Sequence, residues 1–300
     1  MKVILGGGLV ALLARDILGS DWTIVPIGRS RFYSFDPPIV DNYIIKNDVI
    51  DEYMKQYTII PLLYRTGYSY CGQILFNARV PISPFLLKVY GSNIPSHAEA
   101  YWLSRMDHFG YGNCCDIYKS LQDKYKSEVL ANNAKFGIPI SIKDHEITTT
   151  TGAHTQYESI ISTVPLSALL KWVGIDYDLK AKDVHCFHMR TDALDFEGAT
   201  KLFVVDQEID FYEVVMLDRL NYVFHAHKPI DMPGKYFMKF IKRFDLVAET
   251  KIEGAIQCGP IPEIPELDDV NIIRVGSSVW DDCLDVGSSI KRLIKAGHAG

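Results

Sequence analysis

Hydrophobic and polar positions follow two different periods along the chain, and together they predict alternating strands and helices. Short apolar runs typical of buried strands cover residues 2–5, 22–27, 138–142, 146–151, 156–162 and 271–275. Helical spacing of apolar residues covers 9–18, 84–90, 99–109, 115–125, 166–173, 232–246 and 287–296. A period close to two prevails between residues 185 and 227. The mixture indicates an α/β fold.

The period-two region differs in kind from the apolar runs. Its strands are expected at 201–205, 212–216 and 222–227, and shorter ones at 57–64 and 73–76. The alternation indicates sheet strands in this region.

Three glycines connect the first predicted strand to the first predicted helix. They read as Gly6-x-Gly8-x-x-Ala11, the strand–turn–helix opening of a dinucleotide-binding fold. Gly6 allows the tight turn, Gly8 lets a pyrophosphate approach the backbone, and Ala11 keeps the helix close to the strand. The amides and dipole of the helix N-terminus would then face the phosphates. The motif predicts a nucleotide cofactor without saying which one.

Two other interpretations of this segment are weaker. The apolar stretch of a signal peptide would not contain three glycines, and here Arg15 and Asp16 follow that stretch at once without a cleavage site. A strand–turn–helix unit that binds no ligand remains an alternative because the motif is short. One departure matters more: the acidic residue expected about 20 positions beyond the glycines is absent, and Gly28 and Arg29 occupy that region. An arginine there would suit the 2′-phosphate of NADP, which keeps a nicotinamide cofactor open.

Composition narrows the remaining classes. The 300 residues are 48% hydrophobic and carry a formal net charge of −6, and no block of Lys and Arg stands out, so we expect a globular protein without an electrostatic footprint for duplex DNA. No apolar run reaches the roughly 18 residues of a membrane span. The six cysteines are scattered without a C-x-x-C pair, which argues against a zinc site and favours reduced thiols in the cytoplasm.

Three segments, taken in order, resemble one group of flavoproteins. They are the Gly6-Gly7-Gly8 unit, the run Tyr157-Glu-Ser-Ile-Ile-Ser-Thr-Val-Pro-Leu166, and Asn271-Ile-Ile-Arg-Val-Gly-Ser-Ser-Val-Trp-Asp-Asp282 before the last helix. The sequence here is similar to the FAD-dependent amine-oxidase, protoporphyrinogen-oxidase and UDP-galactopyranose-mutase-like proteins. The resemblance implies a Rossmann-type FAD-binding domain and a second mixed or antiparallel β-sheet substrate domain. Their expected extents are 1–56, 126–180 and 250–300 for the first, and 57–125 and 181–249 for the second.

The resemblance also implies which residues hold the cofactor. Gly6, Gly7, Gly8 and Ala11 would line the pyrophosphate, and Arg29 and Ser30 would lie near the adenosine. Further contacts are expected at Ser162, Thr163, Pro165, Gly276, Ser277, Trp280, Val286, Gly287 and Ser288. The N-terminus of the last helix would face the flavin and stabilise negative charge on it.

The chemistry implied is hydride transfer from a small amine to flavin N5, followed by hydrolysis of the imine, with little demand on side chains. The candidates for a catalytic role are Tyr212, His225, His227 and Lys201. His225 and His227 lie two apart on one strand, so their side chains share a face. They could act as bases, or bind a metal if further ligands exist, and no such ligand is identified.

Three functional classes remain open. The leading one is an FAD-dependent oxidoreductase or lyase that cleaves a C–N bond of a small amine or of an amino-acid-modified nucleoside. Small phage enzymes that trim glycinyl-thymidine during DNA hypermodification are similar in size and cofactor, which would place the chain in a host cytoplasm. The alternatives are a sugar-nucleotide mutase that uses reduced flavin, and a non-catalytic nucleotide-binding flavoprotein. Substrate, electron acceptor and oligomeric state are not determined by the sequence.

Overall fold

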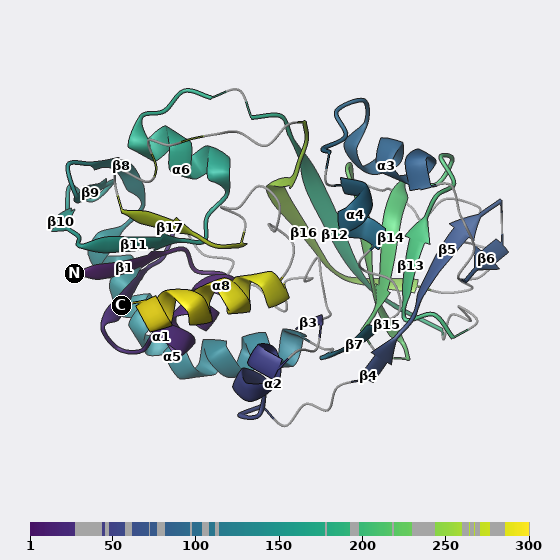
Figure 1. The fold of residues 1–300 in the computed structure, drawn as a ribbon, viewed down its shortest axis with the longest axis horizontal. Helices are drawn as coiled ribbons and strands as arrows, with labels where there is room; N and C mark the ends of the chain where they lie inside the picture. The colour runs from purple at the N-terminus through teal and green to yellow at the C-terminus, as the bar shows by residue number, and fades with distance from the viewer. Residues whose placement is uncertain are drawn as a thin grey trace.

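The fold was obtained as a computed structural model of the whole chain. It describes residues 1–27, 44–45, 48–57, 62–71, 73–76, 82–96, 98–103, 108–111, 114–177, 179–192, 198–217, 219–229, 244–259, 264, 267, 271–276 and 286–299. Figure 1 shows two sheets of different character, with helices packed on each.

The first sheet is parallel and joins segments from the start, the middle and the end of the chain. Its order is β17-β11-β1-β2, formed by Ile272–Arg274, Ser159–Ser162, Lys2–Leu5 and Trp22–Val25. β1 lies in the centre and pairs in parallel with both β11 and β2. The carboxyl ends of these strands therefore meet at one edge, which is where ligands bind in open α/β sheets.

Helices cover both faces of this parallel sheet. On one face Ile4 and Ile24 pack with α1 (Leu9–Leu18), α5 (Cys114–Phe136) and α8 (Val286–Ala299). On the other face Val3 and Leu5 pack with α6 (Leu166–Val173) and with a small antiparallel sheet. That small sheet consists of β8 (Pro139–Lys143), β9 (Glu146–Thr149) and β10 (His154–Gln156). Both faces are buried, which is why the parallel strands read as continuous apolar runs.

The second sheet is larger and mixed, with seven strands in the order β16-β12-β15-β14-β13-β5-β6. These are Phe244–Gln257, Ala181–Thr191, Asn221–Ala226, Phe211–Met216, Lys201–Val204, Thr66–Tyr70 and Gln73–Leu75. All of its pairs are antiparallel except β5 with β13. α3 (Ile82–Tyr90) and α4 (Ala98–Leu103) lie over one face, where the rings of Phe85, Trp102 and Phe203 meet at centroid distances of 5.0–5.1 Å (Figure 1).

Two shorter parts complete the described structure. β3 (Ile44–Ile45), β7 (His108–Tyr111) and β4 (Leu62–Tyr64) form an antiparallel sheet. α2 (Asp48–Met54) packs against α8, and α8 also contacts β3. No helix in the described ranges is long and apolar enough to cross a membrane.

Most of the predicted elements are confirmed. Two segments that were predicted as helix form strands instead, and both have the same physical reason. Residues 244–246 end the predicted helix 232–246 but belong to β16, which pairs with β12 along nearly its whole length; residues 232–243 lie outside the described part. Residues 108–109, expected in a helix, belong to β7. In both places pairing with a strand distant in sequence decides the conformation over local spacing. The sequence also gave no sign of α2, and it ended α5 at residue 125 instead of Phe136.

Candidate functional site

The turn after β1 can accept only glycine at position 6. Gly6 has φ +137°, and its N–H donates to the Val25 carbonyl at 3.1 Å. A Cβ built on Gly6 would lie 2.0 Å from Thr163 Oγ1. Thr163 is itself fixed, because its backbone N–H and its hydroxyl both donate to the Leu5 carbonyl, at 3.0 and 2.9 Å. The glycine that the motif predicted is thus required by the protein's own packing.

Gly8 differs from Gly6, because a Cβ there would have space around it within the described part of the chain. It is the N-cap of α1, with φ −87°, and a Cβ built on it has no atom of a described residue within 4 Å. No side chain caps the helix, and its first turn holds no acidic residue. Since the first amides of a helix have no intrahelical acceptor, this end of α1 presents N–H donors and a positive dipole end beside an open backbone. Such an arrangement suits an anionic phosphate group.

The middle and C-terminal segments approach the same turn. The N–H of Val275, directly after β17, donates to the Ser162 carbonyl at the end of β11 over 2.9 Å. Gly276 follows with φ +61°, and a Cβ there would lie 3.2 Å from both methyl carbons of Val10 in the first turn of α1. Segments more than 100 residues apart are therefore held together around Gly8. We call Gly6, Gly7, Gly8, Thr163 and Gly276 the glycine site.

The other predicted cofactor residues fall into two groups. Ala11 is buried in α1, Ser162 and Pro165 flank Thr163, and Val286, Gly287 and Ser288 begin α8, which packs along α1 (Figure 1). The first turn of α8 holds no acidic residue. Arg29, Ser30, Ser277 and Trp280 lie outside the described residues, so the adenosine end of a dinucleotide has no structural account.

The four candidate catalytic residues come together in the second sheet, around a residue that the sequence did not single out. Glu213 lies between two of them: its Oε1 is 2.7 Å from Lys201 Nζ, and its Oε2 is 2.7 Å from His225 Nδ1. The Tyr212 ring stacks on His227, with centroids 4.9 Å apart, and lies 6.2 Å from His225. Cys186 on β12 is the register partner of His225. We call Lys201, Glu213, His225 and Cys186 the polar network.

A β-bulge explains why the sequence pattern did not indicate Glu213 as a site residue. In the pairing of β14 with β15 the register shifts between Phe211 and Glu213, so Tyr212 is an extra residue. A regular strand would place Tyr212 and Glu213 on opposite faces, but a bulge turns neighbouring side chains towards one side. Phe211 packs on Phe224 on the other face, in a different core cluster from Tyr212. The resemblance to related flavoproteins pointed to Tyr212, and the bulge that brings Glu213 to the same face cannot be read from the period.

Burial and charge act against each other in the polar network. Burial alone would raise the pKa of Glu213, but Lys201 and His225 lower it to about 2. Burial alone would lower the pKa of His225, but Cys186 and Glu213 raise it to about 9. Both residues are therefore charged at neutral pH, in a place with almost no solvent.

The polar network is closed off from solvent on the side that carries α3 and α4. Lys201, Tyr212, Glu213 and His225 are 0–2% exposed. Tyr212 packs in the same core cluster as residues of α3 and α4. His227 retains partial exposure, and its Nδ1 donates to the Asp183 carbonyl at 3.1 Å. Burial lowers its pKa, which keeps the ring neutral near pH 7.

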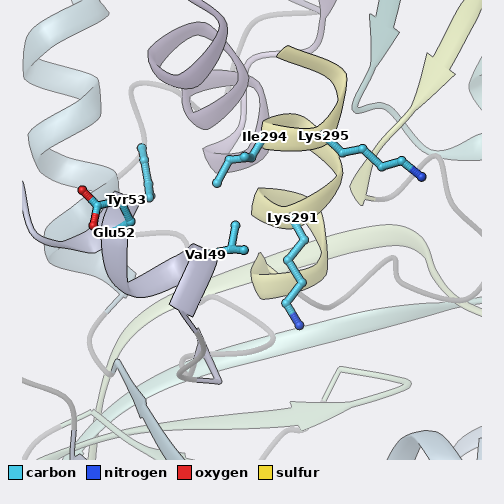
Figure 2. A pocket seen from close by; sticks show the side chains of 6 residues that line it. All are labelled: Val49, Glu52, Tyr53, Lys291, Ile294 and Lys295. Carbon is cyan, nitrogen blue, oxygen red and sulfur yellow. The ribbon is translucent and has the colours of Figure 1, made fainter. Parts of the chain in front are cut away.

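A separate open groove lies between α2 and α8, with a volume of about 740 Å³ (Figure 2). Val49, Glu52 and Tyr53 line it from α2, and Lys291, Ile294 and Lys295 from α8. Figure 2 shows Val49 and Ile294 facing each other, while both lysine side chains extend away from them. The groove contains none of the predicted site residues. Within the described residues, no group of three His, Cys, Asp or Glu side chains could hold a metal ion.

Comparison with known proteins supports the fold and does not define a family. No protein-family model matches the chain, and no curated protein sequence does. Among solved structures, reduced UDP-galactopyranose mutase covers 99% of this chain over 92% of its own, with a TM-score of 0.67 and 13% identity. An oxidoreductase from Methanosarcina mazei covers 99% of this chain and 100% of its own, with a TM-score of 0.58 and 11% identity.

A third similar structure is p-nitrophenol 4-monooxygenase PnpA from Pseudomonas putida DLL-E4, with a TM-score of 0.58, 11% identity, and 99% of this chain matched to 78% of that one. The chain thus has an α/β fold with a Rossmann-type parallel sheet and a second mixed sheet, as predicted from its sequence. Identities this low establish the fold alone.

Proposed function

We propose that the chain is an FAD-dependent oxidoreductase whose cofactor pyrophosphate binds at the glycine site. The observation that carries this proposal is the contrast between two glycines. Gly6 is enforced by Thr163, whereas a Cβ at Gly8 would meet no atom of the described residues within 4 Å. Packing therefore does not require glycine at position 8, but a phosphate at the N-terminus of α1 would.

We propose the following cofactor contacts on the same geometry. The turn of Gly6, Gly7 and Gly8 with the first amides of α1 would hold the pyrophosphate, while Thr163 and Gly276 border it. The N-terminus of α8, from Val286 to Ser288, would lie near the flavin ring and favour negative charge on it. Bound FAD would supply hydride acceptance and return, which no side chain of the chain can provide.

For the substrate we propose a small amine or an amino-acid-modified nucleoside, with cleavage of a C–N bond. Hydride removal from a neutral amine needs positioning more than a strong acid or base, and three of the four candidate residues are buried. We propose that His227, which is partly exposed and neutral, contacts the substrate. Tyr212, His225 and Lys201 would then act as positioning residues behind it.

A second function is favoured by one observation, the TM-score of 0.67 to a mutase over nearly the full length of both chains. A sugar-nucleotide mutase would require the flavin to be reduced before any turnover. The two proposals differ in what an amine does to the oxidised enzyme. Anaerobic bleaching of the flavin by an amine supports the oxidoreductase, whereas activity that appears only after reduction with dithionite supports the mutase.

The cofactor proposal is tested first by the absorbance spectrum of the purified protein. We expect a flavin spectrum in the wild type, directly or after addition of FAD. The variant Gly8→Val should fold but bind no FAD, because its side chain occupies only the space that the pyrophosphate needs. Normal FAD content in that variant, or no binding by the wild type, would contradict the proposal. Circular dichroism of the variant separates loss of binding from loss of fold.

A further inference from the structure

The open groove between α2 and α8 has an apolar floor. Val49 of α2 and Ile294 of α8 face each other across it, and 46% of the Val49 surface is exposed (Figure 2). The groove has a volume of about 740 Å³, so this apolar surface lies between two charged helices without cover from a described residue. Apolar surface with a charged rim is typical of a site that binds another protein.

The two walls of the groove carry opposite charge. The acidic wall is α2, which holds three acidic residues and no basic one. The basic wall is α8, which holds two lysines, one arginine and no acidic residue. Glu52 lines the groove from the acidic wall, and Lys291 and Lys295 line it from the basic wall. Because the two lysines are four positions apart, they lie one helical turn apart on the same face.

These charges are presented to solvent. Glu52 pairs with Lys55 of the same chain segment, but both side chains are at least 70% exposed, and such a pair contributes little. Lys291 and Lys295 are exposed, and neither forms an ion pair with another residue in the described ranges. Each wall can therefore pair with charges on a second molecule at little cost.

Both walls are fixed by contacts outside the groove. The hydroxyl of Tyr53 donates to Asp16 of α1 at 2.9 Å and lies 3.1 Å from the hydroxyl of Tyr57. On the other side, α8 packs along α1. Since α1 supports both walls, a partner that enters the groove does not have to order them, which lowers the cost of binding.

We propose that this groove is the contact surface between two copies of the chain, related by a two-fold axis. Such an axis places α2 of one copy on α8 of its partner, and the reverse. Each acidic wall then meets a basic wall, and the two apolar floors cover each other. A partner with a uniformly acidic or uniformly basic surface would match one wall and be repelled by the other. The opposite charges within one groove therefore favour a second copy.

The first test is sedimentation velocity of the full chain from about 1 µM to about 100 µM. We expect a monomer–dimer equilibrium, with less dimer as salt rises from about 0.05 M to about 0.5 M, because salt screens exposed charges. Val49→Asp puts a charge into the apolar floor and should leave the protein monomeric. Val247→Asp is the matched control, since Val247 is 54% exposed on β16 and does not line the groove. It should dimerise like the wild type.

Charge reversal tests the two-fold arrangement itself. The double variant Lys291→Glu, Lys295→Glu makes both walls acidic, and the double variant Asp48→Lys, Glu52→Lys makes both walls basic. Each should be monomeric alone, whereas an equimolar mixture should form a mixed dimer, because its two copies then carry opposite charges on every facing wall. Circular dichroism establishes that each variant is folded.

Three results would overturn the proposal. They are a wild type that stays monomeric over the whole range, a dimer that persists in Val49→Asp, and folded charge-reversed variants whose mixture stays monomeric. None of these measurements depends on bound FAD, so the proposal can fail or succeed independently of the proposed function.

Discussion

At the scale of single residues, the two glycines of the first turn have different reasons to be glycine. Gly6 combines a positive φ with a neighbour, Thr163 Oγ1, that would lie 2.0 Å from any Cβ. Gly8 has an ordinary φ of −87° and open space around it. A motif read from sequence treats both as one signature, whereas stability and cofactor binding should separate them.

Gly6→Ala should therefore destabilise the fold, because the new Cβ is forced against Thr163 in a backbone conformation that L-residues rarely adopt. The expected loss is about 2–4 kcal/mol of unfolding free energy, measured by urea denaturation. Gly8→Ala is the matched control and should change stability by less than about 1 kcal/mol. Equal stability of the two variants would show that the approach of Thr163 is not rigid.

Replacement of Glu213 should lower the unfolding free energy far more than replacement of an exposed carboxylate. Its loss would leave Lys201 and His225 as buried charges without a carboxylate, and breaking such a pair costs about 3–5 kcal/mol. We expect Glu213→Gln to lower the unfolding free energy by that order. Glu208→Gln, at an exposed position in the connection that precedes β14, is the control and should have little effect. A small effect of Glu213→Gln would mean that the network relaxes.

The polar network also predicts how stability depends on pH. The pKa of Glu213 falls from 4.5 to about 2 on folding, so its contribution is present above pH 4.5 and is lost as the pH falls towards 2. The pKa of His225 rises from 6.5 to about 9, so its contribution is present below pH 6.5 and is lost as the pH rises towards 9. Denaturation curves across this range should show His225→Gln flattening the alkaline side. An unchanged alkaline slope in that variant would contradict the assignment.

At the scale of elements, two devices place side chains where periodicity alone would not. The bulge in β14 brings Tyr212 and Glu213 to one face of the second sheet. Beside the parallel sheet, Asp16 of α1 is hydrogen-bonded to residues of both α5 and α2. Its carboxylate accepts hydrogen bonds from Lys124 and Tyr125, at 2.5 and 2.8 Å, and from Tyr53 at 2.9 Å. Burial works against this carboxylate, yet these partners lower its pKa.

Asp16→Asn should loosen α2 in particular, since Tyr53 of that helix donates a hydrogen bond to this carboxylate. Amide hydrogen exchange over residues 48–54 should become faster, while exchange in β1 and β11 stays slow. The effect should appear in the wild type as the pH falls below 3.8, where the ordinary carboxyl protonates. Asp21→Asn, at an exposed position, is the control. Unchanged exchange in α2 would mean that apolar packing alone holds it.

At the scale of the whole molecule, the glycine site joins distant parts of the chain. β1 begins the sequence, Thr163 follows β11 in its middle, and Gly276 follows β17 near its end. A ligand bound at the glycine site would contact all three segments. Its binding should therefore stabilise the parallel sheet and its helices together, and not a single loop. The second sheet is attached through β12 and β16, which follow α6 and precede β17 in the chain.

FAD should therefore raise the melting temperature of the wild-type protein. A ligand present at 100 times its dissociation constant adds about 2.7 kcal/mol to the unfolding free energy. Gly8→Val should show no such shift, although its melting temperature without FAD should resemble that of the wild type. A shift of equal size in both proteins would place the binding site elsewhere.

The sequence by itself determined the elements whose signals are local. The apolar runs of β1 and β11, the helical spacing of α6 and α8, and the turn of Gly6 to Gly8 all depend on residues that are neighbours in the chain. The resemblance also predicted that the start, middle and end of the chain belong together, and in the structure β1, β11 and β17 pair in parallel in one sheet. Residues 2–5 carry a continuous apolar run because both faces of their sheet are covered.

Only the tertiary structure decided the rest, because the interactions concerned join residues far apart in sequence. The strand β16 exists through its pairing with β12, which overrides local helical spacing. Glu213 enters the polar network through a bulge that depends on β15, and Gly6 is enforced by a threonine 157 positions away. Burial of Tyr212, Lys201 and His225 depends on α3 and α4. The hydrophobic period of an element indicates which of its faces is buried, but not which residues bury it. The charge and reactivity of a buried group depend on those residues.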